Sequence, residues 1–166
     1  MADFDELYAA HYTSLATQLY AYLGDRGEAQ DVVQEAFCRA LARWDRLRDY
    51  DDPLAWIRRV AWNLATSHLR RLTVAAAHRR RQRTEHEAPP NPDRVALVVA
   101  LRELPERQRR VLVLRYLADL PIAEIAQAMN SPEGTIKVLL HRGRIALAAR
   151  LGADAALTTP EVHDHA

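Results

Sequence analysis

The most informative segment of the sequence is Ile122–Leu147, which reads IAEIAQAMNSPEGTIKVLLHRGRIAL. A short apolar-periodic segment over 122–129 is followed by a tight turn at Asn130-Ser131 and then by a longer helical pattern. We expect Ser131 to cap this longer helix, with Pro132 in its first turn. A short helix, a turn and a longer helix are typical of a helix-turn-helix motif.

The longer helix of this motif has two distinct faces. At 100° per residue, one side gathers Ile136, Leu140, Gly143 and Leu147. The opposite side presents Lys137, Val138, His141, Arg142 and Ile145, with Thr135 at its margin. Basic side chains bond guanine edges and small apolar groups touch thymine methyls, so this face suits the DNA major groove. An ordinary amphipathic hairpin with a charged outer face remains the alternative.

Outward from this motif, the composition favours helices throughout the chain. Of 166 residues, 49% are hydrophobic and only 5 are glycine, a mixture unlike that of a β-sandwich or barrel. We therefore predict an all-α fold. Apolar residues at steps of three and four predict helices over 4–23, 28–47, 53–71, 95–103, 106–117, 122–129 and 132–151.

A polar segment, 78–93, divides these helices into two groups. It reads HRRRQRTEHEAPPNPD, has no apolar periodicity and holds three prolines. Proline removes amide donors and restricts the residue before it, so we predict a flexible basic linker. The chain is then expected to form a three-helix domain over 1–77 and a four-helix domain over 94–151, followed by a disordered tail over 152–166.

Charge is distributed unevenly along the chain. Residues 1–52 carry 5 arginines against 11 acids, a net charge of −6. Residues 53–84 hold 8 arginines and no acid, and residues 134–151 hold 4 basic residues and no acid. Two acid-free basic segments indicate two contacts with a polyanion, and the acidic segment indicates a contact of another kind. For a single run, a solvated helix face is an equal alternative.

The helix predicted over 53–71 carries an aromatic and cationic face opposite its apolar stripe. This face gathers Trp56, Arg59, Asn63, Thr66 and Arg70, with Trp62 beside them. Aromatic rings stack on unpaired bases, arginines follow phosphates, and an amide can read one base edge. The alternative is that the tryptophans pack against the first helix, which we expect for one of the two. Asp52 is expected to cap this helix ahead of Pro53.

The helix predicted over 28–47 separates polar from apolar side chains. Its polar face gathers Asp31, Gln34, Glu35, Cys38 and Ala42, opposite Val33, Phe37, Ala40 and Trp44. An acidic and amide patch of this kind suits docking on a basic partner surface. Plain solvent-facing polarity is an equal alternative.

Three segments together resemble one known family. They read DVVQEAFCRALARW (31–44), AWIRRVAWNLATSHLRR (55–71) and LPERQRRVLVLRYLADLPIAEIAQAMNSPEGTIKVLLHRGR (104–144). In this order they resemble the group IV, or extracytoplasmic function (ECF), sigma factors of bacterial RNA polymerase, within the sigma-70 family. The resemblance extends over about residues 4–151. A lone helix-turn-helix is a weak signal, whereas this linked pair of motifs is a specific one.

The resemblance implies three sets of contacts. The set for the β′ clamp helices of RNA polymerase is Asp31, Gln34, Glu35 and Phe37. The set for the −10 promoter element, where strands open, is Arg48, Asp51, Asp52, Trp56, Arg59, Asn63 and Arg70. The set for the −35 element is Arg115, Thr135, Lys137, Val138, His141 and Arg142. It also implies contact with the polymerase β flap and, as in many members, an anti-sigma factor as inhibitor.

Two positions depart from the family pattern. Relatives commonly read Lys-Ser-Arg where this chain has Lys137-Val138-Leu139, so we predict fewer polar −35 contacts and a methyl contact from Val138. Pro121 stands where a capping serine or threonine is usual, so the short helix lacks a side-chain cap worth about 1 kcal/mol. Both changes bear on promoter sequence rather than on the class of function.

Other classes of function are disfavoured by the residues. A single cysteine excludes a disulfide framework and indicates a reducing cytoplasm, and no stretch approaches the ~20 apolar residues of a membrane span. We expect no catalytic residue, no metal site and no cofactor. A DNA-cutting enzyme would have only Asp49, Asp51 and Asp52 as clustered acids, on a short connector. A stand-alone helix-turn-helix regulator is the main alternative, although it would not need a base-stacking face.

Overall fold

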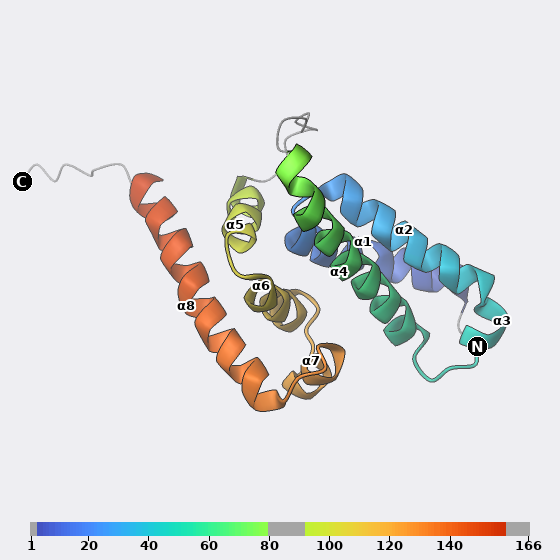
Figure 1. Cartoon of the computed structure of the whole chain (residues 1–166). Coiled ribbons are helices and arrows are strands. Elements are labelled where there is room, and N and C mark those ends of the chain that lie inside the picture. Colours follow the sequence, from blue (N-terminus) through green and yellow to red (C-terminus); the bar gives the residue numbers. More distant parts are fainter. Residues whose placement is uncertain (1–2, 80–91, 159–166) are drawn as a thin grey trace, which may run out of the picture.

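The computed structural model describes residues 3–79 and 92–158, in which every regular element is a helix (Figure 1). The N-terminal half contains α1 (Phe4–Leu23), α2 (Arg26–Ala42), α3 (Trp44–Leu47) and α4 (Pro53–Arg79). The C-terminal half contains α5 (Pro92–Arg102), α6 (Glu106–Leu112), the π-helical η1 (Val113–Leu117), α7 (Ile122–Ala128) and α8 (Glu133–Thr158). The predicted all-α fold is confirmed, including the short and long helices of the helix-turn-helix pair.

Local polar contacts define where the first helices begin and end. The Asp25 carboxylate accepts a hydrogen bond from the Glu28 amide at 3.0 Å and caps α2. The Asp52 carboxylate accepts one from the Ala55 amide at 3.1 Å, which is the cap predicted for α4. Gly24 ends α1 in the left-handed region at φ 77°, where a residue without a β-carbon is favoured.

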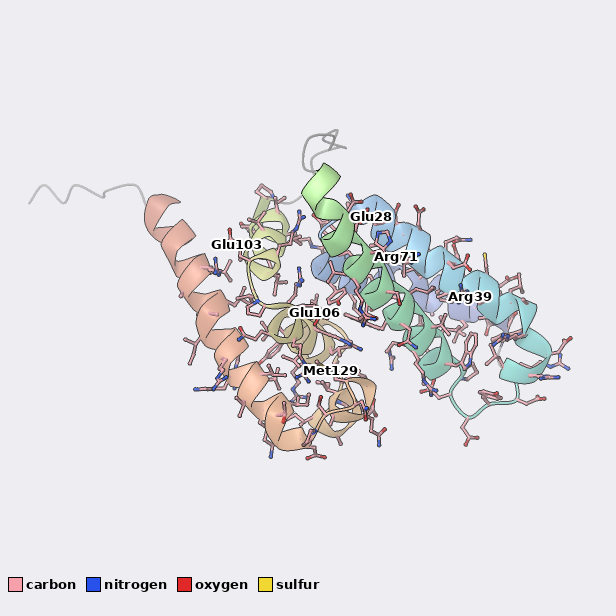
Figure 2. The ribbon with its side chains drawn as sticks, in the orientation of Figure 1. Glu28, Arg39, Arg71, Glu103, Glu106 and Met129 are labelled. Carbon is pink, nitrogen blue, oxygen red and sulfur yellow. The ribbon has the colours of Figure 1, made fainter. Side chains whose placement is uncertain are left out.

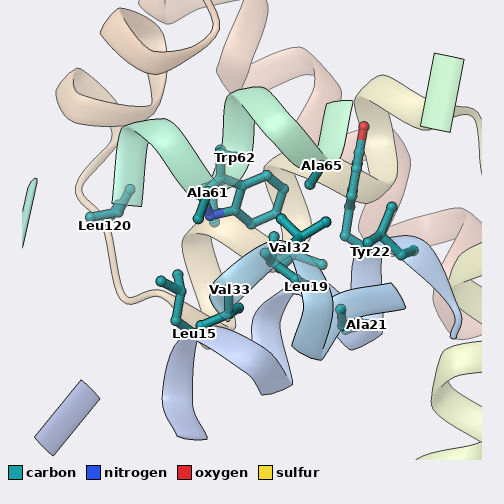
Figure 3. Packing of buried hydrophobic residues seen from close by; sticks show 14 of the residues in the cluster. Leu15, Leu19, Ala21, Tyr22, Val32, Val33, Ala61, Trp62, Ala65 and Leu120 are labelled. Carbon is teal, nitrogen blue, oxygen red and sulfur yellow. The ribbon is translucent and has the colours of Figure 1, made fainter. Parts of the chain in front are cut away.

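Three helices of the N-terminal half enclose an apolar core. The most deeply buried side chains come from α1, α2 and α4: Leu19, Tyr22, Val33, Phe37, Ile57 and Ala61. Trp62 of α4 lies in the same core against Tyr22 of α1, with 5.0 Å between the ring centroids (Figure 3). Aromatic rings bury more apolar surface than other side chains, so this pair contributes strongly to the stability of the core.

The C-terminal half packs its helices around α8. Its fully or nearly fully buried side chains include Val111, Leu114, Ile125, Ile136 and Leu140. Gly143 of α8 is buried against α6, and a β-carbon at this position would lie 3.2 Å from Leu112 Cγ. The missing side chain therefore lets α6 and α8 approach closely.

The two halves pack directly against each other (Figure 1). Helix α1 lies against α5 and against η1. Buried residues of both halves, among them Leu19 and Leu114, form one continuous hydrophobic cluster. The two predicted helical domains therefore share this cluster.

Several predicted boundaries differ from the observed ones. The helix expected over 28–47 is interrupted at Arg43 (φ −118°, ψ 15°), and 106–117 becomes α6 followed by π-helical η1. The tail was expected to begin at 152, but α8 continues to Thr158 because alanine and leucine at 153–157 favour a helix without an apolar face. Residues 80–91, most of the predicted linker, and 159–166 lie outside the described residues.

Candidate nucleic-acid and protein interfaces

The outward face of α8 is free for a partner. Lys137, His141 and Arg142 are exposed, and Val138 is 47% exposed. Thr135 is half-buried near the start of the helix, while Ile136 on the opposite face is fully buried. The sequence-predicted residues therefore lie together on one side of a helix that is anchored by its other side. The same arrangement presents basic groups and one methyl-bearing side chain to a groove.

Arginines of the C-terminal half support the turns on either side of α7. Arg115, half-buried, donates from Nη1 to the Leu120 carbonyl at 3.0 Å. Arg107 donates to the Ser131 hydroxyl at 2.6 Å, and this hydroxyl donates to the Met129 carbonyl at 3.1 Å. Ser131 was expected to cap α8, but the contacts seen here tie it to the preceding turn. Pro121 gives α7 no side-chain cap, as predicted.

The polar face of α4 is partly open and partly buried. Arg59, Asn63 and Arg70 are exposed, as predicted. Trp56 is half-buried, and the Arg43 guanidinium lies 5.8 Å from its ring centroid. Trp62 is only 4% exposed, so of the two tryptophans it is the one that packs against the first helix. Trp62 is therefore not available to stack on a base in this state.

A groove runs between α4 and the C-terminal half. Its volume is about 540 Å³. One wall is formed by α4, with Arg58, Arg59 and Asn63, and the other by α6, η1 and α7, with Arg110 and Glu124. The candidate strand-binding residues of α4 thus face another part of the same chain.

The connector before α4 is exposed. Arg48 and Asp51 are both exposed, and Asp52 combines exposure with its capping role. Tyr50 is 53% exposed on the same connector, and we did not predict it as a site residue. An aromatic residue within a polar connector was the signal that could have identified it.

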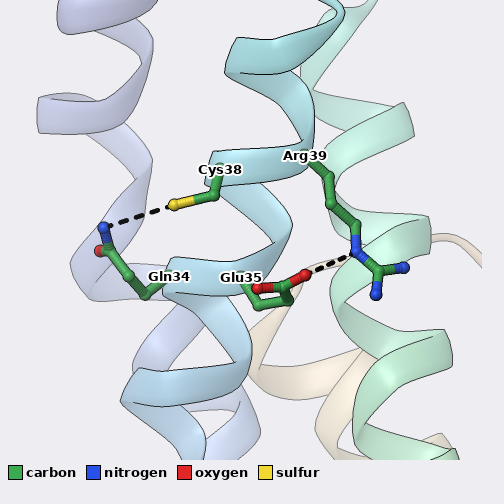
Figure 4. Close-up of polar contacts among 4 residues, drawn as sticks. All are labelled: Gln34, Glu35, Cys38 and Arg39. Carbon is green, nitrogen blue, oxygen red and sulfur yellow. Dashed lines mark hydrogen bonds and ion pairs between the residues drawn. The ribbon is translucent and has the colours of Figure 1, made fainter.

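The polar face of α2 is ordered by its own side chains. Glu35 pairs with Arg39 at 2.8 Å, and the Gln34 amide donates to the Cys38 sulfur at 3.8 Å (Figure 4). The Tyr8 hydroxyl of α1 donates to Gln34 Oε1 at 3.1 Å, and Asp31 is exposed one turn earlier. This surface therefore presents pre-oriented carboxylate and amide groups to a partner.

Two apolar side chains of α2 differ in exposure from what the predicted contact set implies. Phe37, which belongs to that set, is 1% exposed and does not lie at the surface. Its ring packs against Phe4, Tyr8 and Tyr12 of α1, with the Tyr8 centroid 5.0 Å away. Leu41, by contrast, is 57% exposed, three residues after Cys38 of the polar face of α2. The spacing of seven residues from Gln34 was the signal for it.

A buried polar cluster lies where the halves meet. The Tyr22 hydroxyl donates to Glu106 Oε1 at 2.5 Å, and the Arg109 guanidinium lies 5.4 Å from the Tyr22 ring centroid. Burial, and then the hydrogen bond to Glu106, raises the pKa of Tyr22 well above its ordinary value. Burial lowers the pKa of Arg109, and Tyr22 and Glu106 partly offset this. The sequence patterns predicted none of these contacts.

Two other kinds of feature are absent from the described ranges. No group of three or more histidine, cysteine, aspartate or glutamate side chains there is placed to hold a metal ion. None of the helices in those ranges combines the length and apolar character that a membrane crossing requires.

Two family models match the chain in order. The model described as Sigma-70 region 2 matches residues 7–74, and the model described as Sigma-70, region 4 matches residues 94–147. Among curated relatives, the ECF RNA polymerase sigma factor SigW of Bacillus subtilis is 32% identical over 149 residues, covering 80% of each chain.

Solved structures share the fold. The sigma factor RpoE of Bartonella quintana, solved in complex with the anti-sigma factor NepR, matches with a TM-score of 0.76 and 21% identity over 93% of this chain and 99% of that one. CnrH, solved with the cytosolic domain of CnrY, matches with a TM-score of 0.66 and 24% identity over 91% and 88% of the two chains. At these identities the likeness bears on the fold alone.

Proposed function

Because this chain belongs to the ECF sigma factors, which direct RNA polymerase to promoters, we propose how its two halves divide that work. The N-terminal half, residues 1–77, binds core polymerase and holds the opened −10 element. The C-terminal half, residues 94–151, reads the −35 duplex. Matches to region 2 and region 4 over 7–74 and 94–147 support this division.

The polymerase contact is assigned to the exposed face of α2. Asp31, Gln34 and Glu35 present acceptors to the β′ clamp helices, and Leu41 adds an apolar anchor at the end of this face. Phe37 supports this face from below by packing against α1. The contact with the polymerase β flap is assigned to the C-terminal half of this chain.

Strand opening at the −10 element is assigned to α4 and its connector. Unpairing and unstacking a base costs a few kcal/mol, which stacking and edge hydrogen bonds can offset. Asn63 supplies donor and acceptor groups to a base edge, while Arg59 and Arg70 follow the phosphates. Trp56 supplies a ring, and the connector with Arg48, Asp51 and Asp52 receives a displaced base.

The −35 contact is assigned to the exposed face of α8. Lys137, His141 and Arg142 reach guanine edges and phosphates, and Val138 touches a thymine methyl. Thr135 lies near the phosphates, and Arg115 joins the contact while supporting the turn before α7. Because Val138 replaces the serine common in relatives, we expect a preference for thymine at one position of the −35 element.

The remaining assignments follow from this role. The protein acts by binding, without catalysis, and it works in the cytoplasm where polymerase is found. RpoE, which shares this fold, was solved with the anti-sigma factor NepR, and this supports an anti-sigma factor as a partner of this chain too. A stand-alone regulator is not favoured, because such a protein has no use for a strand-binding face on α4.

The observation that carries this proposal is the exposed Asn63 amide on α4, within a match to region 2. The test is in vitro transcription with core polymerase on a genomic promoter library, followed by Asn63→Ala on a responsive promoter. We expect normal core binding and a loss of promoter opening of about tenfold, since one base-edge hydrogen bond is removed.

Ser67→Ala is the matched control, because Ser67 is an exposed polar residue one turn further along α4. It should open promoters at the unaltered rate. Full promoter opening by Asn63→Ala would show that α4 does not hold the opened strand. Failure of the unaltered protein to bind core polymerase would remove the whole proposal.

A further inference from the structure

The groove between α4 and the C-terminal half has the size of a site for a small organic ligand. Its volume of about 540 Å³ lies within the range of about 300–1,000 Å³ that is typical of such sites. Side chains of α4 on one wall and of α6 and α7 on the other are directed into the space between these helices (Figure 2). A single inorganic ion would fill only a small part of this volume.

Two buried donors in this groove lack an acceptor. Trp62 lines the groove and is only 4% exposed, and its Nε1 has no hydrogen-bond partner among the described residues. On the opposite wall, Arg110 Nε is buried and unpaired in the same way. The Arg110 guanidinium is fixed by a hydrogen bond from Nη2 to the Ala128 carbonyl at 3.3 Å, and it lies 6.0 Å from the centroid of the Trp62 ring. Buried donors are nearly always paired, so two of them together indicate a site for a ligand that carries acceptors.

The charges around the groove indicate what kind of acceptor fits. Three arginines and two carboxylates line it, a net charge of +1: Arg58, Arg59, Arg110, Asp52 and Glu124. None of the ion pairs among the described residues includes one of these arginines. Guanidinium groups bind phosphate through paired hydrogen bonds. A phosphate monoester carries a charge of about −1.5 to −2 at pH 7, which matches this lining better than the larger charge of a triphosphate.

The remaining lining suits a flat heteroaromatic ring. Asn63 of α4 and Gln127 of α7 each offer an amide donor and an amide acceptor to the edge of a base. Glu124 offers an acceptor to a ring N–H or an amino group. Leu114 and Leu120 supply apolar surface for the face of the ring. A purine has donors and acceptors along its edge, and its two fused rings use more of this volume than a pyrimidine does.

We propose that this groove binds a purine nucleoside monophosphate. The phosphate accepts hydrogen bonds from Trp62 Nε1 and Arg110 Nε, with Arg58 beside it. The edge of the base meets the Asn63 and Gln127 amides. Asn63 also belongs to the set assigned to the opened −10 strand, so the nucleotide and that strand exclude each other, a consequence that rests on the proposed function of α4.

The test is isothermal titration calorimetry of the full chain with guanosine monophosphate and with adenosine monophosphate. We expect saturable binding of at least one of them to one site, with a dissociation constant below about 1 mM. Guanosine, adenosine and inorganic phosphate each retain only part of the contacts and should bind at least about tenfold more weakly. Inorganic phosphate that binds as tightly as the nucleotides would overturn the proposal, because the base would then contribute nothing.

Variants of the two unpaired donors locate the site. Arg110→Gln removes a charged donor and should weaken nucleotide binding about tenfold. Trp62→Phe keeps an aromatic ring in the core and removes the indole donor, so it should weaken binding about fivefold. Arg107→Gln is the matched control on the same helix, because Arg107 is exposed and bonds to Ser131 outside the groove. It should bind the nucleotide as the unaltered protein does, and circular dichroism verifies that each variant is folded.

Absence of saturable binding by both nucleotides would overturn the proposal, as would equal affinities of Arg110→Gln and Arg107→Gln. Promoter opening by the unaltered protein with core polymerase is measured in parallel by permanganate footprinting without added nucleotide. If promoters open while nucleotides fail to bind, the nucleotide site is wrong and the sigma-factor assignments stand. If nucleotides bind as expected while no promoter opens, the site stands and the proposed function has failed.

Discussion

In the −35 contact proposed for α8, base preference depends on single exposed residues. Lys137 is exposed on the helix face opposite the buried Ile136, so its ammonium group can enter a groove without disturbing the core. A good contact from a basic side chain to a guanine edge contributes about 1–3 kcal/mol of discrimination. We therefore expect Lys137→Ala to weaken binding to the preferred −35 sequence by about that amount and to relax its base preference.

Arg150→Ala removes the same charge from the same helix and is the control for this prediction. Arg150 pairs with Glu103 of the α5–α6 connection, away from the start of α8. Binding to −35 duplexes of varied sequence, measured by fluorescence anisotropy at constant salt, distinguishes the two variants. Equal losses for both would mean that Lys137 contributes only charge.

It was easier to predict which polar side chains are exposed than whether an aromatic ring faces solvent or the core. Helical spacing correctly separated Arg59 and Asn63 from the apolar stripe of α4, because periodicity reports which side faces solvent. Helical spacing placed Phe37 opposite the polar face of α2, and only the family resemblance assigned it a partner contact. For Trp62, spacing left a base contact and the core as alternatives. Both are buried here, against α1.

At the scale of elements, the close contact of α6 and α8 depends on one glycine. Gly143 is buried, and a β-carbon there would already lie 3.2 Å from Leu112 Cδ1 and 3.5 Å from the Gln108 carbonyl oxygen. A long side chain must push the two helices apart. We expect Gly143→Leu to lower the free energy of unfolding by about 1–3 kcal/mol, as overpacked cores do.

Gly134→Ala is the matched control on the same helix. No atom lies within 4 Å of a β-carbon at Gly134, so alanine should raise helix stability by about 0.5–1 kcal/mol. Urea unfolding followed by circular dichroism measures both variants. A Gly143→Leu protein as stable as the parent would show that α6 and α8 do not pack closely.

The helices were predicted well where one apolar face continues, as along α1, whose bounds of 4–23 were correct. Predicted helix boundaries were wrong where the backbone conformation changes without a change in the apolar pattern. At Arg43 the helix is interrupted, but Trp44 and Leu47 continue the spacing of apolar residues found in α2. The spacing alone therefore predicts one unbroken helix. The π-helical turn over 113–117 could not be predicted either, because its apolar residues still fit a period of 3.6 residues.

At the scale of the whole molecule, the packing of one half on the other could not be predicted. Tyr22, Glu106 and Arg109 each fit a local helix pattern, and nothing in the spacing links a residue of α1 with two of α6. Besides its aliphatic contacts, the interface includes polar and aromatic contacts whose residues periodicity assigns to the surface or to a local core. Only the assembled chain reveals that they meet.

The contact of Tyr22 with Glu106 makes the stability of the whole molecule change with pH in the alkaline range. Tyr22 is fully buried, and burial raises the pKa of its hydroxyl in the folded state above the ordinary value of 10.0 that applies in the unfolded chain. Below pH 10 both states keep the proton, so the stabilisation is fully present. Above pH 10 the unfolded chain loses the proton first and therefore binds fewer protons, so stability falls as pH rises.

We expect the unaltered protein to lose about 1.4 kcal/mol of unfolding free energy per pH unit above 10 through this one group. Tyr22→Phe should lack that component, because phenylalanine has no proton to lose. Urea unfolding at several pH values between about 9 and 11 compares the two proteins, and the other tyrosines cancel in the difference. Parallel curves for the two proteins would mean that the Tyr22 hydroxyl is already reached by water, with the halves apart in solution.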